Sequence, residues 1–394
     1  MAGRARPLSS LSIALLALPF LAGCAIPAAA DPAAAGGVEV LDQRVLRRED
    51  GTRGIPVGGL SEIAVLAPVD DTGLGRFLAI SDDRGEWGPP RALRLDIHFD
   101  LQTHRFRILD RDWQWLTATA ADGVARPDVI DGEALRYDPS TGHMIWSSEG
   151  WPQLQVPPGL YESTLGGELA RQLPLPAHFM PDAAKPQARG IRPNKGIEAL
   201  DLSPGGRHIT FLSEFALAQD QYPGRTAHRP ILRVVTYDRR AGRPVAEHGY
   251  RLELQPDPQA PGGAGGTEIN GAVSILLLGD GRYLVLERGF WFGYRLRVRL
   301  YLADPTGAED LLVWEAPFEA GVVTARKWLV SDLIGAGLAA DNWEGMAFGP
   351  DLPDGRKTLI LITDDNFNQV FQSTIIAWIA LPPLGAVAAR GPAQ

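Results

Sequence analysis

Lys195-Gly196-Ile197-Glu198-Ala199-Leu200 is one of five segments in which a glutamate is followed by small and apolar residues. The other four segments are Gly59–Val65, Asp131–Leu135, Gly266–Gly271 and Asn342–Met346. The five glutamates are Glu62, Glu133, Glu198, Glu268 and Glu344, and their spacings are 71, 65, 70 and 76 residues. A motif that returns at a nearly constant spacing indicates an internal structural repeat.

Each repeat continues through a turn into an apolar run that ends in an acid. In the third repeat, Thr210-Phe211-Leu212-Ser213 leads to Glu214, 16 residues after Glu198. The corresponding acids of the other repeats are Asp82, Asp83, Glu149, Glu287, Asp364 and Asp365. The turns between the two halves are rich in Gly, Pro, Asp and Ser, which supply the backbone conformations of a hairpin reversal. Each repeat therefore predicts a β-hairpin with an acid near its start and another near its end.

The repeat also predicts how the hairpins assemble. A hairpin returns to the end from which it started, so both acids of a unit lie at the same end. Sheet-rich repeats of roughly 40–70 residues are typical of β-propeller blades. We therefore predict an all-β propeller with five detectable repeats and an acidic ring at the mouth of its central channel. A sixth, degenerate blade, closed by residues 38–48 and 374–382, is also compatible with the sequence. The one helix predicted spans residues 329–340.

The N-terminal residues predict export. Arg4 and Arg6 precede a short apolar run over residues 11–22, which is too short for a membrane span and resembles a signal peptide. The run ends in Leu21-Ala22-Gly23-Cys24, a sequence similar to a bacterial lipobox, and Cys24 is the one cysteine of the chain. We expect a lipoprotein signal peptide over residues 1–24, lipidation of Cys24, a flexible tether over 25–37 and one folded domain over 38–384. Ala25 follows the cysteine, which favours the outer membrane.

The composition limits the classes of partner. Removal of residues 1–24 leaves 36 basic and 47 acidic residues, a net charge of −11. This charge argues against nucleic-acid binding, which needs a basic face, and suits a cation. We expect a monomer that is held to the membrane through Cys24 and acts on a small molecule.

A ring of carboxylates needs positive charge nearby, because neighbouring carboxylates resist joint ionisation. Ca²⁺ can supply that charge, since this ion takes six to eight oxygen ligands. We therefore predict that Glu62, Glu133, Glu198, Glu268 and Glu344 bind calcium. The alternative is that these glutamates accept hydrogen bonds from backbone amides and fix the strand ends between blades.

Basic residues lie beside several of the terminal acids. Arg84 follows Asp83, Arg288 follows Glu287, and Lys195 precedes Glu198 by three residues. A metal ion together with Arg and Lys is a common arrangement for holding phosphoryl groups. The sequence contains no Gly-x-Ser-x-Gly elbow, no Walker loop and no His-Glu-x-x-His motif, which argues against those chemistries.

Four segments resemble the signature motifs of a known family. The resemblance as a whole extends over about residues 55–382. The four segments are Asn194–Leu200, Leu286–Phe290, Asp341–Met346 and Asp364–Phe367. They are similar to the phytase-like family, described as "esterase-like activity of phytase". The resemblance implies a β-propeller that hydrolyses phosphoesters or esters. Related bacterial propeller phytases have six blades and use Ca²⁺ with water as the nucleophile, whereas five repeats are visible here.

Three functions follow as hypotheses. The first is a calcium-dependent phosphomonoesterase in which Asp83 or Asp364 orients the attacking water and Arg84, Lys195 and Arg288 neutralise the phosphate. The second is a calcium-dependent lactonase or carboxylesterase with Glu62, Asn270 and Asp364 as ligands. The third is a binding platform without catalysis, in which calcium pins the blades together. The fold alone does not choose among them, because function depends on the site.

Overall fold

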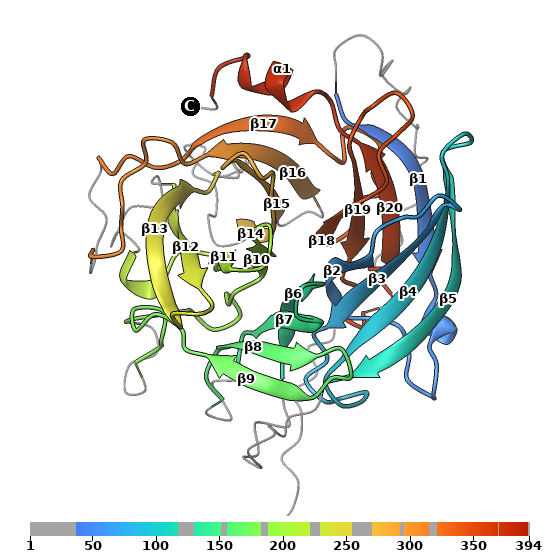
Figure 1. Ribbon diagram of the computed structural model, residues 1–394, viewed down its shortest axis with the longest axis horizontal. Helices are drawn as coiled ribbons and strands as arrows, with labels where there is room; N and C mark the ends of the chain where they lie inside the picture. The colour runs from blue at the N-terminus through green and yellow to red at the C-terminus, as the bar shows by residue number, and fades with distance from the viewer. Residues whose placement is uncertain are drawn as a thin grey trace, which may run out of the picture. The chain divides into compact units, whose positions relative to one another are not determined.

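The computed structural model describes residues 37–392 except 117–129, 151–155, 183–187, 221–228, 254–269, 292–294, 315–320 and 369. The predicted signal peptide, Cys24 and all of the predicted tether except Gly37 lie outside these residues, as does Glu268. The described chain is almost entirely β-structure, arranged as five four-stranded antiparallel sheets around a common centre (Figure 1). The predicted five-bladed β-propeller is therefore confirmed.

Each blade is a meander whose first strand lies innermost. Blade 1 contains β2 (Leu60–Ala67), β3 (Leu74–Ser81), β4 (Arg91–Asp100) and β5 (Arg105–Trp115). Blade 2 contains β6 (Gly132–Asp138), β7 (His143–Ser148), β8 (Gly159–Thr164) and β9 (Leu169–Leu173). Blade 3 contains β10 (Ala199–Leu202), β11 (His208–Leu212), β12 (Ile231–Asp238) and β13 (Arg243–Arg251). Blade 4 contains β14 (Asn270–Leu277), β15 (Tyr283–Trp291), β16 (Arg295–Asp304) and β17 (Arg326–Asp332).

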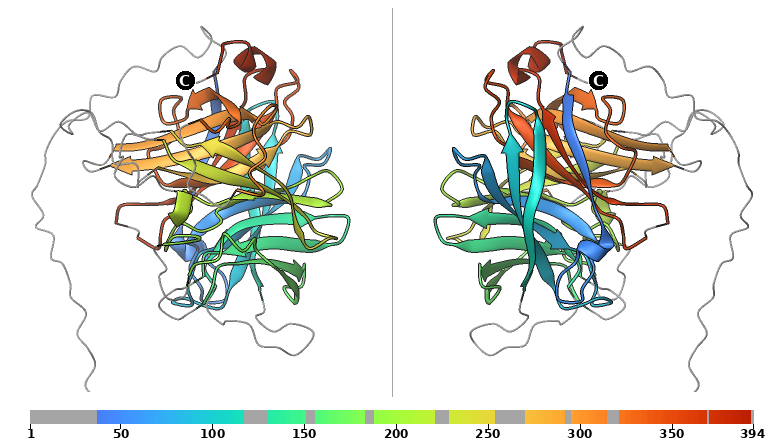
Figure 2. Two further views of the ribbon diagram at one scale, coloured as in Figure 1. Left: turned by 90° about the vertical axis from the view of Figure 1, so that its left-hand side faces the viewer. Right: turned by 90° about the vertical axis from the view of Figure 1, so that its right-hand side faces the viewer.

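Blade 5 closes the ring with strands from both ends of the domain. It contains β18 (Trp343–Phe348), β19 (Thr358–Thr363) and β20 (Thr374–Ala380), with β1 (Glu39–Leu46) as its outermost strand. The antiparallel register of β1 and β20 runs from Glu39 opposite Ala380 to Leu46 opposite Thr374. In the right-hand view of Figure 2, the blue β1 lies between the teal strands of blade 1 and the red strands of blade 5. The segments considered for a sixth blade thus pair with each other inside the fifth.

The apolar runs are strands because both faces of an inner sheet are covered by neighbouring blades. Every residue of β19 and β20 is buried, and the two strands read Thr-Leu-Ile-Leu-Ile-Thr and Thr-Ile-Ile-Ala-Trp-Ile-Ala. Strands that are buried on both faces read as continuous apolar runs rich in β-branched residues. The turn after β6 shows how the hairpins reverse. The Asp138 carboxylate accepts from the amide and hydroxyl of Ser140, and Gly142 adopts a φ of 72°.

The centre of the channel is filled by one arginine. Arg136 on β6 donates to backbone carbonyls on the inner strands of three other blades, at Ile63 on β2, Ile275 on β14 and Met346 on β18. Its Nε also donates to the Asp201 carboxylate on β10 over 3.1 Å. Because Arg136 contacts all five blades, it ties their inner strands together at the axis.

Helical structure is sparse among the described residues. It consists of α1 (Leu384–Ala388) and two single 3₁₀ turns, η2 (Arg48–Asp50) and η4 (Ala218–Asp220). No helix in this part of the chain has the length and apolar character needed to cross a bilayer. The helix predicted over residues 329–340 is wrong, because residues up to Asp332 continue β17 and turns follow. Pairing with β16 across the blade decides this segment in favour of a strand.

Candidate functional site

The repeated hairpins bring acids from four blades to one cavity. In blades 1 and 2, Asp82 follows β3, Glu133 lies in β6 and Glu149 follows β7. In blade 3, Glu198 precedes β10 and Glu214 follows β11. In blade 5, Glu344 lies in β18 and Asp364 follows β19. All of these line a cavity of about 600 Å³. Its basic residues are Arg84, Lys195 and Arg288. The predicted acidic ring at one end of the channel is therefore present among the described residues.

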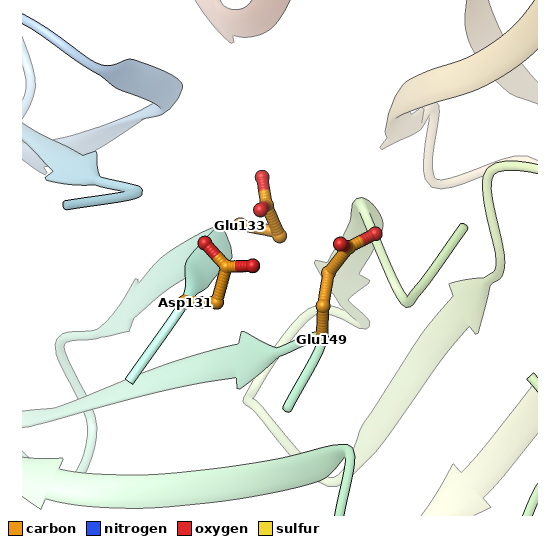
Figure 3. A group of neighbouring side chains, drawn as sticks. All are labelled: Asp131, Glu133 and Glu149. Carbon is orange, nitrogen blue, oxygen red and sulfur yellow. The ribbon is translucent and has the colours of Figure 1, made fainter. Parts of the chain in front are cut away.

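The tightest group of carboxylates belongs to blade 2. Oxygens of Asp131, Glu133 and Glu149 all lie within 4.8 Å of one another, and Figure 3 shows the three side chains converging. Asp131 and Glu133 are two residues apart where β6 begins, a spacing that places side chains on one face of a strand. Glu149 follows β7 and returns to the same end of the hairpin. Its Oε1 accepts from the backbone amide of Gly196, the residue that precedes Ile197 and Glu198, over 2.5 Å.

Burial and mutual repulsion disfavour ionisation of these acids. Burial, followed by neighbouring carboxylates, raises the pKa of Asp82 to about 8. Burial and the charge of Asp131 raise the pKa of Glu149 to about 8 as well. Burial, followed by the charges of neighbouring carboxylates, places the pKa of Glu133, Glu198 and Asp364 well above the usual range of a carboxyl group. Without added positive charge, the cavity therefore holds protons at neutral pH.

Several of these carboxylates have oxygens that no donor satisfies within the described part of the chain. They are Oδ1 of Asp82, Oδ1 of Asp131, Oε2 of Glu198 and Oε1 of Glu214. An unsatisfied buried carboxylate oxygen is costly, and native proteins pair such groups with donors or metal ions. All of the candidate ligands are oxygens, which is the donor type that Ca²⁺ prefers. The residues present therefore fit a hard divalent cation.

The three predicted basic residues all face acids of the cavity. Arg84 donates from Nε to Asp131 over 2.7 Å and from Nη2 to Asn194 over 3.0 Å. Lys195 Nζ lies 2.6 Å from Glu214 Oε2. Arg288 pairs with Glu344, and its Nη1 lies 3.7 Å from Glu214 Oε1. Each of the three bases is therefore paired with at least one acid of this region.

Glu62 does not join the other predicted metal ligands. It is fully buried inside the channel, where its carboxylate accepts from the amides of Ile63 and Met346 and the hydroxyl of Ser274. Its Oε2 also lies 3.0 Å from Arg136 Nη1. Burial raises the pKa of Glu62 to about 7, although Arg136 and the three donors oppose this shift. The alternative interpretation, in which a repeat glutamate fixes strand ends through amide bonds, describes Glu62.

Asp83, predicted to orient a water molecule, is committed to a buried arginine. Its Oδ2 lies 2.5 Å from Arg91 Nη1, and its Oδ1 accepts from the amides of Glu86 and Trp87. The preceding residue, Asp82, instead has an oxygen without a donor in the cavity. Asp83 therefore shapes the turn that carries Arg84, and Asp82 is the acid that faces the site.

The ligand set of the lactonase hypothesis is not brought together. Asp364 lines the cavity, and its Oδ2 lies 3.4 Å from Asn342 Nδ2. Asn270 donates instead to the carbonyl of Glu253 and to the carboxylate of Glu287, in a separate buried network. Because Glu62 lies against Arg136, these three residues do not form one site.

Two important acids have a signal in the sequence besides the glutamate repeat. Asp131 precedes Glu133 by two residues, so strand alternation predicts that both side chains share a face. Asp82 and Asp83 are adjacent, so alternation predicts that they point to opposite sides, but it does not say which one faces the channel. The position of Arg91 decides this, because it pairs with Asp83.

Several solved structures resemble the chain at low identity and low TM-score. The solved structures that resemble the chain include the propeller of Dos1, with 10% identity over 82% of this chain and 68% of that one, and a TM-score of 0.32. They also include the β-propeller domain of the trilobed protease from Pyrococcus furiosus, with 8% identity over 78% of this chain and 79% of that one, and a TM-score of 0.29. The periplasmic gluconolactonase of Pseudomonas aeruginosa shares 14% identity over 83% of this chain and 90% of its own, with a TM-score of 0.33.

At such identities the likeness to solved structures concerns the fold alone. No sequence among the curated proteins matches the chain. The profile of the phytase-like family, described as esterase-like activity of phytase, matches residues 55–367. This match includes every cavity residue named above and covers most of the propeller. The chain therefore belongs to the phytase-like family.

Proposed function

We propose that the protein is a calcium-dependent hydrolase of phosphate monoesters. One observation carries the proposal: buried carboxylates from four blades surround a single cavity, and several of their oxygens have no donor in the described chain. Such a site needs a cation, and three basic side chains beside it suit an anionic substrate. Membership of the phytase-like family supports the choice of an ester as the substrate.

Asp131, Glu133 and Glu149 would hold the cation, with Asp82 and Glu198 close enough to couple electrostatically with them. When bound, Ca²⁺ would neutralise the carboxylates and make water in the site more acidic. The Glu149 side chain is already oriented by the Gly196 amide, so this ligand needs little reorganisation.

Asp82 is the best-placed acid to accept a proton from the attacking water. Its Oδ1 is buried and lacks a donor within the described residues, so this oxygen is open to accept a proton. Arg84 and Lys195 have partly exposed side chains and would hold phosphoryl oxygens, together with Arg288. Asp364 and Asn342 would orient the substrate from the blade 5 side of the cavity.

Two other functions can use the same cavity. A lactonase or carboxylesterase would need only the cation and a general base, although the ligands proposed for it from the sequence do not converge. A binding platform would keep calcium as a pin between blades and show no turnover. We further propose that Cys24 anchors an exported monomer to the outer membrane, and that the propeller works outside the cytoplasm.

The test is hydrolysis of p-nitrophenyl phosphate and phytate by the purified mature protein, with Ca²⁺ or with EDTA. Turnover should require Ca²⁺, and Asp82→Asn should lower kcat/KM by about 100-fold or more. Glu133→Gln should raise the Ca²⁺ concentration needed for activity. Glu49→Gln, at an exposed position outside the cavity, is the matched control and should match the wild type.

Hydrolysis of lactones with inert phosphate esters would select the second function. Stabilisation by Ca²⁺ without turnover of any ester would select the platform. Turnover of phosphate esters that is unchanged by EDTA would remove calcium from the proposal.

A further inference from the structure

One side of the acidic cavity is apolar. Phe290, Leu296, Phe367 and Phe371 line it together with the carboxylates. Phe371 is 68% exposed and the nearby Val370 is 81% exposed, so large apolar surface is open to solvent at the rim. Exposed apolar surface that borders a polar cavity is typical of a ligand-binding site.

Specific hydrogen bonds and ring contacts hold the apolar side of the cavity in place. Asn366 and Phe367 both have positive φ, 45° and 49°, a conformation that costs energy for residues other than glycine. The Asp365 Oδ1 holds this turn, because it accepts from the amides of Phe367 and Gly59 over 3.1 and 2.8 Å. Trp87 stacks on Phe367 with ring centroids 5.9 Å apart, and the Arg48 guanidinium covers Trp87 at 4.0 Å.

The ring of Phe367 lies immediately beside the proposed general base. A Cβ at Gly59 would meet Asp82 Oδ1 at 2.1 Å and Phe367 Cε2 at 2.5 Å, so both atoms border the same point in space. Gly59 also accepts from the Asp82 amide over 2.8 Å. An apolar group bound against Phe367 would therefore sit next to the reacting end of the site.

The charge of the cavity argues against a substrate with many phosphates. Nine acidic and three basic side chains line it within the described residues. Each base already faces an acid: Arg84 faces Asp131, Lys195 faces Glu214, and Arg288 faces Glu344. One cation together with these bases suits one phosphate group, whereas a polyanion such as phytate would bring further charges for which the described lining has no further base.

We infer that the substrate is a phosphate monoester with a single phosphate on an apolar, preferably aromatic, body, which packs against Phe367 and Phe371 while the phosphate faces the carboxylate-bound cation. This inference rests on the proposed phosphoesterase function and names its substrate class. Burial of a phenyl group against these rings corresponds to a preference of about tenfold to a hundredfold.

The experiment compares kcat/KM for 2-phenylethyl phosphate, ethyl phosphate and phytate in the presence of Ca²⁺. The two monoesters release alcohols of similar acidity, so their ratio reports the apolar contact. We expect at least a tenfold preference for the phenyl compound, and Phe371→Ala should bring the ratio close to one. Leu109→Ala, a truncation of another exposed apolar side chain, on β5, should leave the ratio unchanged.

A binding measurement distinguishes failure of this inference from failure of the proposed function. Calorimetry with 2-phenylethylphosphonate and ethylphosphonate measures the same preference without turnover. Hydrolysis of both monoesters at equal kcat/KM, or a preference for phytate, overturns the inference and leaves the phosphoesterase. Selective binding of the phenyl phosphonate that depends on Phe371, with no ester hydrolysed, upholds the inference and removes the phosphoesterase. Absence of both selectivity and turnover overturns both.

Discussion

The partners of each carboxylate decide what it does in this propeller. Glu62 and Asp83 are as deeply buried as the acids of the cavity, but each contacts an arginine and backbone amides. Asp82, Asp131 and Glu198 each keep an oxygen without a donor in the described chain. A carboxylate surrounded by donors stabilises structure, whereas one with an unsatisfied oxygen needs a proton or a cation.

Stability without calcium should therefore fall as the pH rises. The pKa of Asp82 and Glu149 is about 8 in the folded state, against ordinary values of 3.8 and 4.5. Because the folded state holds more protons than the unfolded state, the free energy of unfolding in EDTA should decrease from about pH 5 to above pH 8. At the proposed calcium site, Ca²⁺ would displace these protons, so the rise in Tm on adding Ca²⁺ should be small at pH 5.5 and grow up to pH 8.5.

Thermal unfolding in EDTA and in Ca²⁺ across this pH range measures both effects. Asp82→Asn and Glu149→Gln should each flatten the pH dependence in EDTA. A calcium-induced rise in Tm that is the same at pH 5.5 and pH 8.5 would contradict the electrostatic coupling of Asp82 and Glu149 to the cation.

Arg136 should be among the residues most important for stability. Arg136→Met removes the charge that faces Glu62 and Asp201 and leaves both carboxylates buried without it. Loss of one partner of a buried ion pair costs about 3–5 kcal/mol. Urea denaturation should show this loss, whereas Arg282→Met, which breaks a pair with Asp280 at a surface turn, should stay within about 1 kcal/mol of the wild type. A small effect of Arg136→Met would mean that the blades do not depend on this residue.

At the scale of elements, the hairpins place functional groups through the segments that precede and follow their strands. Gly59, just before β2, donates to Asp365 of blade 5 and accepts from Asp82 of blade 1. It therefore connects two hairpins at the point where Asp82, the proposed general base, and the Phe367 ring meet. Its φ of 60° and the close approach of both side chains require the absence of a Cβ.

Gly59→Ala should abolish activity and destabilise the propeller. The new methyl group would overlap Asp82 Oδ1 and the Phe367 ring, so the cavity must distort. Gly279→Ala is the matched control, since Gly279 has a φ of 78° but a Cβ there would meet no atom within 4 Å. The control should lose only about 1–2 kcal/mol from the left-handed backbone and keep its activity. Equal activity of the two variants would show that the junction at Gly59 is not needed for the site.

At the scale of the whole propeller, one strand from the N-terminal side closes the ring. β1 pairs with β20 in blade 5, and its Asp42 reaches β5 of blade 1. Asp42 Oδ2 accepts from the Phe106 amide and Oδ1 from Arg105, each over 3.1 Å. This buried carboxylate therefore joins the last blade to the first on the outer side.

Asp42→Ala should lower the free energy of unfolding by about 1–3 kcal/mol, because the buried Phe106 amide loses its acceptor. Asp351→Ala, at an exposed position near blade 5, should change it by less than about 0.5 kcal/mol. Urea denaturation of both variants gives the comparison. If Asp42→Ala unfolds like the control, the seam is held by the β1–β20 hydrogen bonds without help from this side chain.

The sequence by itself determined the five repeats and the end of each hairpin at which the acids lie, whereas it left the number of blades at five or six. These features are local, because strand alternation and turn residues act over a few positions. It also predicted one shared face for the acids, and among them Glu133, Glu198, Glu344 and Asp364 line one cavity with Arg84, Lys195 and Arg288.

Only the tertiary structure decided which carboxylates remain without donors. Arg136 contacts Glu62 because closure of the ring brings β2 and β6 to one axis. No spacing in the sequence predicts that contact. The pairing of β1 with β20 likewise depends on closure, since the two strands lie at opposite ends of the domain. Strand periodicity fixes the face on which a side chain lies, but the partners it meets there come from other blades.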